Sequence, residues 1–371
     1  MMRFNLLNII LLAALLLCLL IQLFYYWFYL YQPFRHQRAI KKGIRKTPSE
    51  QPPVSVIVYA RNKAVHLETY LPSILEQSYP KFEVIVINEN STDDTELILN
   101  SLSLRYRNLY HTALPGASRN LSRKKLALTL GVKAAHHDVL LFIEADAHPL
   151  NNKWLESMAR HFTSDKTVVL GGSFLEKYPS RYAVYDYFHE QLQMMAFAIR
   201  KKTFKGNGRN LAYRKDVFEE QKGFANYNFI DAGEDDLLVA AIATQDNVAV
   251  ELSPETSTAV DMERAWMWKE YKLRRALSYP FYKSNVKFLD LLEQCSRLAF
   301  YALSATLSVL FFGNWILLGC VWAFFFIRFF IQIRILNRTA KILNQAQHSL
   351  QLIGFDLVQP FVNLYFYLKK Q

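Results

Sequence analysis

The N-terminal stretch from Leu6 to Tyr31 contains no charged residue, and it constrains the fold more than any other segment. About 20 apolar residues suffice to cross the hydrocarbon core of a bilayer. The stretch is too long for the core of a signal peptide, lacks a small-residue cleavage site, and ends in an aromatic belt from Phe24 to Tyr31. We therefore expect residues 1–32 to form a retained transmembrane helix.

A basic segment, residues 33–51, follows this helix and is interpreted as a juxtamembrane linker. Its cations precede the first acidic residue of the segment, Glu50, and are Arg35, Arg38, Lys41, Lys42, Arg45 and Lys46. Only Arg3 lies on the other side of the helix. Because Lys and Arg are enriched on cytoplasmic flanks, the asymmetry predicts an integral membrane protein with its main domain in the cytoplasm, at a bacterial inner membrane. A nucleic-acid patch is the rival interpretation, but a lipid-facing tether is favoured beside a membrane helix, and no nucleic-acid partner is expected.

A second apolar region runs from Leu298 to Ile333, with Arg328 as its only charge. As one helix it would be about 54 Å long, nearly twice the thickness of a hydrocarbon core. A turn at Gly313-Asn314 would instead divide it into two shorter helices. Residues 286–349 are therefore expected to form a transmembrane hairpin followed by a basic return to the cytoplasm.

The last segment, residues 350–371, is apolar but contains Asp356 and Pro360. It is consistent either with an interfacial helix or with another membrane span. The whole chain is 51% hydrophobic and 15% aromatic, which is rich for a soluble protein. Its three cysteines provide neither a disulfide framework nor a CxxC metal site, as expected for a domain in a reducing compartment.

Between the apolar regions, strand-like and helix-like patterns alternate. Such alternation predicts a three-layer α/β domain with a mainly parallel central sheet, here residues 52–285. Predicted strands are Val54–Tyr59, Phe82–Ile87, Val139–Ile143, Val168–Gly171 and, as the final strand, Val248–Leu252. Predicted helices are Leu67–Gln77, Thr95–Ser101, Ser122–Ala135, Lys153–Phe162, Ser180–Arg200 and Trp266–Ala276.

Two groups of acids are candidate functional residues. The apolar strand Val139–Ile143 runs directly into Glu144 and Asp146. Ligands of open α/β sheets bind beyond the carboxyl ends of strands, where a carboxylate pair can hold a hard cation and its phosphates. Ordinary loop acids are the alternative. The second group, residues 234–236, is three consecutive acids at a predicted helix start, where acids also occur simply because they complement the helix dipole.

Several blocks occur in a recognisable order. They are Ser55–Asn62, Asn90–Asp93, Arg123–Leu128, Glu144–Asp146, Gly206–Tyr213 and Gly233–Asp236. Together, over residues 52–280, they resemble the inverting glycosyltransferases of family 2, in the membrane-bound branch related to cellulose, chitin and hyaluronan synthases. The resemblance implies an α/β domain of the GT-A type that binds a nucleotide-sugar donor, with a UDP-sugar favoured.

The resemblance also implies roles for individual residues. Nucleotide-sugar-binding residues would be Ala60, Asn62, Asn88, Glu89, Lys125, Glu144, Arg274 and Arg275. Asp146 and Glu144 would be ligands of Mg²⁺ or Mn²⁺, and Gly208, Arg209 and Asn210 would contact the acceptor or sugar. The catalytic residues would be Asp235, as the base for an acceptor hydroxyl, with Glu234 and Asp236 beside it.

Four positions depart from the family pattern: Lys63, Glu89, Glu144 and Lys272. They leave three hypotheses open. The first is an active enzyme that adds one sugar to a lipid-linked or polysaccharide acceptor, with Lys63 and Lys272 adding phosphate-binding charge. The second is an impaired homologue that serves as a membrane-bound scaffold for partner proteins of an envelope glycan pathway. The third is a processive polysaccharide synthase, which the loss of the family's Gln and Trp around Arg274-Arg275 disfavours.

Overall fold

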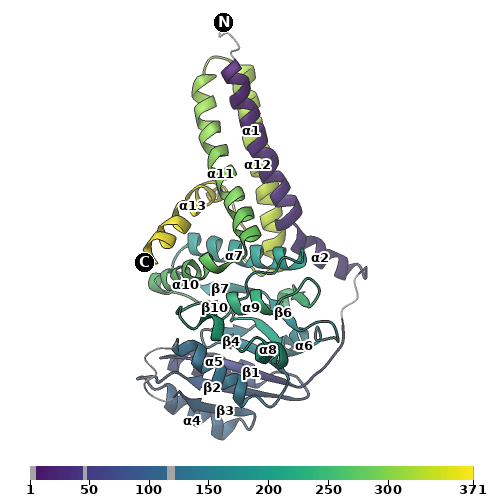
Figure 1. Cartoon of the computed structure of the whole chain (residues 1–371), viewed down its shortest axis with the longest axis vertical. Helices are drawn as coiled ribbons and strands as arrows, with labels where there is room; N and C mark the ends of the chain where they lie inside the picture. The colour runs from purple at the N-terminus through teal and green to yellow at the C-terminus, as the bar shows by residue number, and fades with distance from the viewer. Residues whose placement is uncertain (1–5, 45–47, 115–121, 371) are drawn as a thin grey trace.

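The computed structural model describes residues 6–44, 48–114 and 122–370. A stalk of long helices stands on an α/β domain, and the N-terminal helix descends the stalk toward that domain (Figure 1). Arg3, Arg45 and Lys46, on which the predicted orientation partly rests, lie outside the described residues.

The N-terminal helix is continuous and longer than the sequence suggests. Helix α1 (Leu6–Tyr25) continues through a π-helical turn, η1 (Tyr26–Leu30), into α2 (Gln32–Lys41). The basic segment expected at residues 33–51 therefore begins as a helix. Proline is compatible with the first turn of a helix, and Pro33 lies in the first turn of α2.

The stalk is completed by an antiparallel hairpin of α11 (Ser284–Leu310) and α12 (Trp315–Ile342). The turn expected at Gly313-Asn314 is confirmed: Gly313 has a φ of +95°, which favours glycine, and the Asn314 Oδ1 caps α12 by accepting from the Leu317 amide at 3.3 Å. Among the described residues, the run Leu6–Lys41 and α12 are long and apolar enough to cross a membrane, judged by length and composition alone.

The C-terminal segment folds into α13 (Gln351–Lys369), which leaves the base of the stalk at an angle and lies beside α10 (Ala265–Ser278) (Figure 1). Its Asp356 is buried and faces Arg297 of α11 and Arg328 of α12. Helix α13 therefore joins the stalk to the α/β domain.

The central sheet has seven strands in the order β3-β2-β1-β4-β8-β6-β9. The strands are β1 (Val54–Ala60), β2 (Phe82–Asn88), β3 (Leu109–Ala113), β4 (Val139–Glu144), β6 (Val168–Gly171), β8 (Leu211–Arg214) and β9 (Val248–Glu251). All neighbouring pairs are parallel except those of β8, which runs antiparallel to β4 and β6. The mainly parallel sheet expected from the sequence is confirmed.

Helices cover both faces of this sheet. They are α3 (Ala64–Leu75), α4 (Thr95–Arg105), α5 (Arg123–Ala134), α6 (Trp154–Ala159), α7 (Arg181–Ile199), α8 (Lys215–Glu220) and α9 (Asp236–Ile242), with single turns η2 (Ala225–Tyr227), η3 (Pro254–Thr256) and η4 (Tyr279–Phe281). Alternate residues of β1 enter separate cores: Ile57 packs with α5 and α7, whereas Val56 and Val58 pack with α3 and α6. A strand buried on both faces has this continuous apolar character.

A second, three-stranded sheet consists of β5 (Ala147–Pro149), β10 (Thr258–Asp261) and β7 (Ser173–Lys177), in that order. The expectation that Val248–Leu252 is the final strand is wrong, because β10 follows it. Strand β10 is only four residues long and its partners are far away in the sequence. This sheet begins directly after Asp146, so it extends the edge at which the candidate site lies.

Candidate active site

The ends of three neighbouring parallel strands meet at one edge of the central sheet. Ala60 of β1 lies in register with Asn88 of β2, and Tyr59 lies in register with Glu144 of β4. The carboxyl ends of parallel strands are the usual ligand-binding edge of an open α/β sheet. The structure therefore places Ala60, Asn88, Glu89, Glu144 and Asp146, all expected in one site, at this edge.

The loops that follow β1 and β2 are joined to each other. The Asn62 amide donates to the Ser91 Oγ at 2.8 Å, and the Asn62 Oδ1 accepts from the Thr92 amide at 2.8 Å. Asn62 and Asn90 both have left-handed backbone conformations, with φ of +50° and +49°, which asparagine tolerates better than most residues. Asn62 thus shapes the edge of the site by linking two loops.

Glu89 is buried behind this edge among cations. Its carboxylate accepts from Arg123 Nε at 3.0 Å, pairs with Arg61 at 3.2 Å, and accepts from the Tyr59 hydroxyl. Burial of the Tyr59 hydroxyl, together with this hydrogen bond, raises the pKa of Tyr59 well above its ordinary value. The longer side chain at this position is therefore accommodated by two arginines and a tyrosine.

The carboxylate pair is surrounded by three cations. Arg209 donates to Asp146 through Nε and Nη2, each at 3.0 Å, and its Nη2 is 2.9 Å from the Glu144 Oε2. Lys124 donates to Glu144 at 2.6 Å, and the Lys63 Nζ is 3.7 Å from Asp146. Burial alone would raise the pKa of Asp146, but the charges of Arg209 and Lys63 outweigh it and lower this pKa to about 2. Both carboxylates are therefore ionised and charge-balanced.

The three consecutive acids at the start of α9 do not share one environment. Glu234 pairs with Lys124 at 2.7 Å and with Arg274. Asp236 is bound by Arg275 and accepts from the Tyr282 hydroxyl at 2.7 Å. These contacts hold two of the acids in place.

Asp235 lies between them, half-buried, and its side chain has no hydrogen bond or ion pair in the part of the chain that the structure describes. Burial raises the pKa of Asp235 above its ordinary value, and the charges of Glu234 and Glu144 add to this against the opposing charge of Lys124. A carboxylate that is available and more basic than usual can accept a proton. Asp235 is the N-cap residue of α9, so the helix dipole favours an acid there, but its side chain caps no amide.

One bridging lysine connects the two acidic groups. Lys124 contacts Glu144 and Glu234 at 2.6 and 2.7 Å, so the strand end of β4 and the loop before α9 belong to one site. Its pKa is raised well above the ordinary value: burial opposes the charge, but the carboxylates of Glu144 and Glu234 prevail. Lys124 was not singled out from the sequence, although it lies in the same basic run as the residue that was.

Three residues were expected to bind the nucleotide, the acceptor or sugar, or a phosphate, but their side chains bind elsewhere in the fold. They are Lys125, Asn210 and Lys272. Lys125 donates to the Tyr227 and Ile230 carbonyls, the latter at 2.7 Å, instead of facing the carboxylates. Asn210 is fully buried, and its amide donates to the carbonyls of Gly172 at 2.7 Å and Thr256 at 2.9 Å.

Lys272, expected to add phosphate-binding charge, is likewise buried away from the site. It lies 3.0 Å from both Asp186 and Glu190 of α7, and 2.9 Å from the Asn363 Oδ1 of α13. Its role in the structure is to connect α10 to α7 and α13. The spacing of charges along a sequence does not reveal such long-range pairing.

Gly208 leaves the space that the Asp235 carboxylate occupies. A Cβ at position 208 would lie 2.4 Å from the Asp235 Oδ1, closer than any real contact. We expect Gly208→Ala to displace the carboxylate and to lower turnover at least ten-fold, because sub-ångström placement matters for a catalytic group. Steady-state rates of Gly208→Ala and of Gly319→Ala, where an added Cβ meets nothing within 4 Å, measure the effect. Equal rates in the two variants would show that the position of Asp235 is unimportant.

Comparison with known proteins finds similarity to glycosyltransferases. The chain is 28% identical over 221 residues to the probable glycosyltransferase YdaM of Bacillus subtilis, covering 54% of this chain and 50% of that protein. It is 28% identical over 184 residues to the glycosyltransferase AglE of Haloferax volcanii, covering 48% of this chain and 58% of that protein. The chain thus spans about half the length of these relatives.

A solved structure shares the fold. The mannosyltransferase PcManGT from Pyrobaculum calidifontis, in complex with GDP-Man and Mn²⁺, superposes with a TM-score of 0.58 at 20% identity, covering 91% of this chain and 99% of that chain. The domain therefore shares the GT-A fold of that structure. Residues 55–221 match the family model Glycosyl transferase family 2. The acid triplet and α10 lie beyond the matched residues.

Proposed function

We propose that the protein is an inverting glycosyltransferase that moves a sugar from a nucleotide-sugar donor to a hydroxyl of a membrane-associated glycan or lipid-linked acceptor. The observation that carries the proposal is the unpaired Asp235 carboxylate within a site otherwise neutralised by cations. A general base must be free to take a proton, and a raised pKa brings it closer to the working pH. Asp235 is the acid of the triplet that meets both conditions.

In this proposal the flanking acids and cations position the reactants. Glu234 and Asp236 hold Arg274 and Arg275 beside the base, so two guanidinium groups are available to stabilise charge on the departing diphosphate. On the other side of the site, Arg209 and Lys63 are held by Asp146 and provide further phosphate-binding charge. Inversion then follows from attack by the acceptor hydroxyl on the face of the sugar opposite the nucleotide.

A divalent cation, Mg²⁺ or Mn²⁺, is part of the proposal, and its fit to the site depends on Arg209. The oxygens of Asp146 and Glu144 are of the ligand type that these ions prefer. However, Arg209 occupies both oxygens of Asp146, and the described residues contain no cluster of three or more His, Cys, Asp or Glu side chains suited to a metal. Asp146 and Glu144 would hold the ion once Arg209 turns to the donor's phosphates. The ion would neutralise charge on the diphosphate.

We also propose that α1 and the hairpin of α11 and α12 cross a membrane and that the catalytic domain lies on its cytoplasmic side. Support comes from the apolar runs, from the exposed apolar side chains of α1 and α12, and from the cations that follow α1. Such placement would hold the site near membrane-bound acceptors.

The test is nucleotide-dependent stabilisation of the purified protein. We expect UDP- or GDP-sugars with Mn²⁺ to raise the melting temperature, and Asp146→Asn to remove the part of that rise that depends on the metal. Binding at a hundred times the dissociation constant stabilises a protein by about 2.7 kcal/mol, which is readily measured. Glu263→Gln, at an exposed acid outside the site, is the matched control. The enzyme proposal is wrong if no nucleotide stabilises the protein.

The second candidate is an impaired homologue that binds nucleotide without turnover. It is favoured by the cations around the carboxylate pair. In the described contacts, every carboxylate oxygen of Asp146 and Glu144 has a cation nearby. These cations are Arg209, Lys63 and Lys124. It predicts nucleotide-dependent stabilisation without sugar transfer. A processive synthase is not favoured by any contact at the site.

A further inference from the structure

A basic pocket lies outside the active site, at the base of the stalk. It has a volume of about 630 Å³ and is bounded by the end of α7, the segment after α9 and the start of α11. Asp235 precedes the first residue of α9, whereas Ala243 and Thr244 follow its last. Helix α9 has seven residues and is about 10 Å long, so the pocket and the base lie at opposite ends of it.

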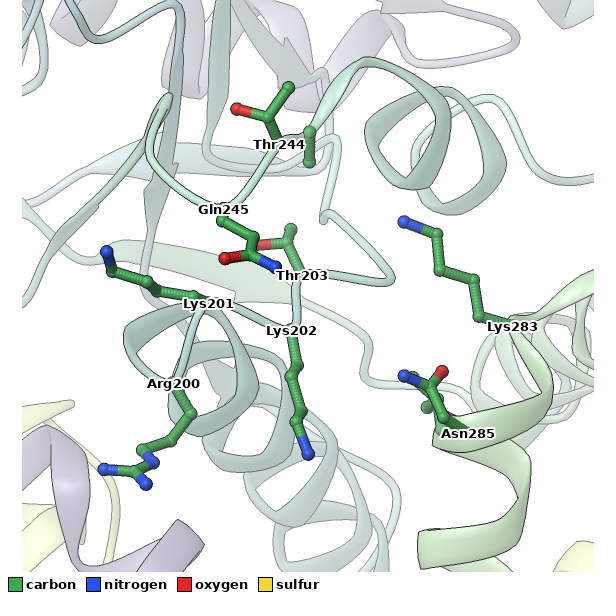
Figure 2. A pocket seen from close by; sticks show the side chains of 10 residues that line it. Arg200, Lys201, Lys202, Thr203, Thr244, Gln245, Lys283 and Asn285 are labelled. Atoms are coloured by element: carbon green, nitrogen blue, oxygen red, sulfur yellow. The ribbon is translucent and has the colours of Figure 1, made fainter.

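Four cations line the pocket: Arg200, Lys201, Lys202 and Lys283. Only Lys201 has a carboxylate partner within the described residues, the exposed Asp246. The ammonium group of Lys283 has no described partner and extends toward the pocket from the α11 side (Figure 2). The pocket therefore carries a net positive charge that the protein itself does not neutralise.

A buried hydroxyl in the wall is also unpartnered. Thr203 lines the pocket and is only 5% exposed, yet its Oγ1 has no hydrogen-bond partner among the described residues. Buried polar atoms are nearly always satisfied, so an orphan beside a cavity indicates a missing partner. Gln245 and Asn285 also line the pocket, and their side-chain amides are labelled in Figure 2. These groups together offer hydroxyl, amide and ammonium donors to an anion.

The pocket wall is attached to the end of the apolar N-terminal helix. The Arg200 guanidinium lies 3.6 Å from the centroid of the Phe28 ring, and the Lys202 Nζ donates to the Tyr29 hydroxyl at 3.1 Å. Both aromatic residues belong to η1, at the end of the stretch without charges. Aromatic side chains with adjacent cations are typical of the level of lipid headgroups.

We propose that this pocket binds the phosphate of an anionic membrane lipid headgroup. The volume of the pocket is large enough for a lipid headgroup, and its cations and hydrogen-bond donors can bind the oxygens of a phosphate. The contacts of Arg200 and Lys202 with η1 place the pocket at the depth of the headgroups. The inference rests on the proposed membrane placement of α1 but not on sugar transfer. A soluble phosphate compound shares the same chemistry, so the experiment separates the two sources.

Binding is measured on the full chain in a neutral detergent, by the melting temperature as phosphatidylglycerol or phosphatidylcholine is added. We expect stabilisation by phosphatidylglycerol and none by phosphatidylcholine. Lys283→Gln is expected to weaken binding of phosphatidylglycerol about five-fold, the effect of one cation near an anionic headgroup. Lys133→Gln, the same charge change at an exposed position on α5, is expected to leave it unchanged.

Thr203→Val is a second variant, which tests the proposal independently if Lys283→Gln does not fold. It keeps the shape of the side chain and removes only the orphan hydroxyl, so we expect unaltered melting without lipid and weaker binding with it. The proposal is overturned if phosphatidylcholine stabilises equally, or if Lys283→Gln and Lys133→Gln behave alike. Equal stabilisation by inorganic phosphate at the same concentration overturns the lipid as the source. These experiments measure lipid binding and not sugar transfer, so their results can be interpreted even if the transferase proposal is wrong.

Discussion

Asp235→Asn is expected to lower the rate of sugar transfer by about 10²- to 10⁴-fold, the contribution of a positioned general base. The amide keeps the size of the side chain but cannot accept the proton of the acceptor hydroxyl. Donor binding should persist, because the cations of the site remain paired with other acids. The initial rate of nucleoside diphosphate release at saturating donor measures the loss of transfer. The melting temperature with donor present measures donor binding.

The neighbouring acid provides the matched control. Asp236→Asn removes a charge that binds Arg275 and the Tyr282 hydroxyl, so we expect a loss of about 1.5–3 kcal/mol of stability, as for a hydrogen bond to a charged group. Asp235 has no such partner, and Asp235→Asn should leave the melting temperature unchanged or higher. If Asp235→Asn transfers sugar at the normal rate, the base is another group. If it melts well below the unaltered protein, its effect on rate reports misfolding instead.

Asp356→Asn is expected to destabilise the protein by about 3–5 kcal/mol, the cost of leaving the buried Arg328 charge without its described carboxylate partner, whereas Arg297 keeps Glu293 at 2.7 Å. The Asp356 carboxylate accepts from Arg328 at 2.7 Å and from Arg297 at 3.1 Å, and all three side chains are buried. The Tyr301 hydroxyl and the Gln332 amide add bonds of 2.9 and 2.7 Å. Asp356 and Gln359 are the described members of this network on α13, and Asp356 carries the charge, so we expect α13 to detach first.

Thermal unfolding in detergent and limited proteolysis of the C-terminal helix measure this effect. Glu270→Gln neutralises an exposed carboxylate of α10 and is expected to change stability by less than about 0.5 kcal/mol. Similar melting and similar proteolysis of the two variants would mean that apolar packing, and not the buried charges, holds α13 in place.

Local pattern was sufficient to predict five of the seven strands of the central sheet and the edge that carries the site, but not β3 or β8. The β-branched runs at Val54–Ala60 and Phe82–Asn88, and the apolar run ending at Glu144, specify strands buried on both faces, and parallel strands must end at a common edge. The proximity of Glu144 to Asn88 and Ala60 follows from that geometry. The same reasoning fails for β10, whose four residues carry too little pattern.

The direction in which each side chain of a predicted helix points could not be predicted from the local sequence pattern. Lys124 and Lys125 are adjacent on α5, and successive residues of a helix point about 100° apart. Only the packing of α5 on the sheet decides that Lys124 reaches Glu144 while Lys125 reaches the carbonyls of Tyr227 and Ile230. Asn210 and Lys272 were misplaced for the same reason, since their partners come from distant segments.

The sequence by itself determined the two apolar regions, the α/β domain between them, and the acidic residues from which the site is built, because periodicity and composition are local properties. Tertiary structure alone decided which acid is unpaired. Glu234, Asp235 and Asp236 are consecutive acids, but Lys124, Arg274, Arg275 and Tyr282 converge on the two outer ones and leave the Asp235 side chain without a partner among the described residues. That distinction arises from charges brought together across the fold, and it supports the choice of Asp235 as base that the family resemblance implies.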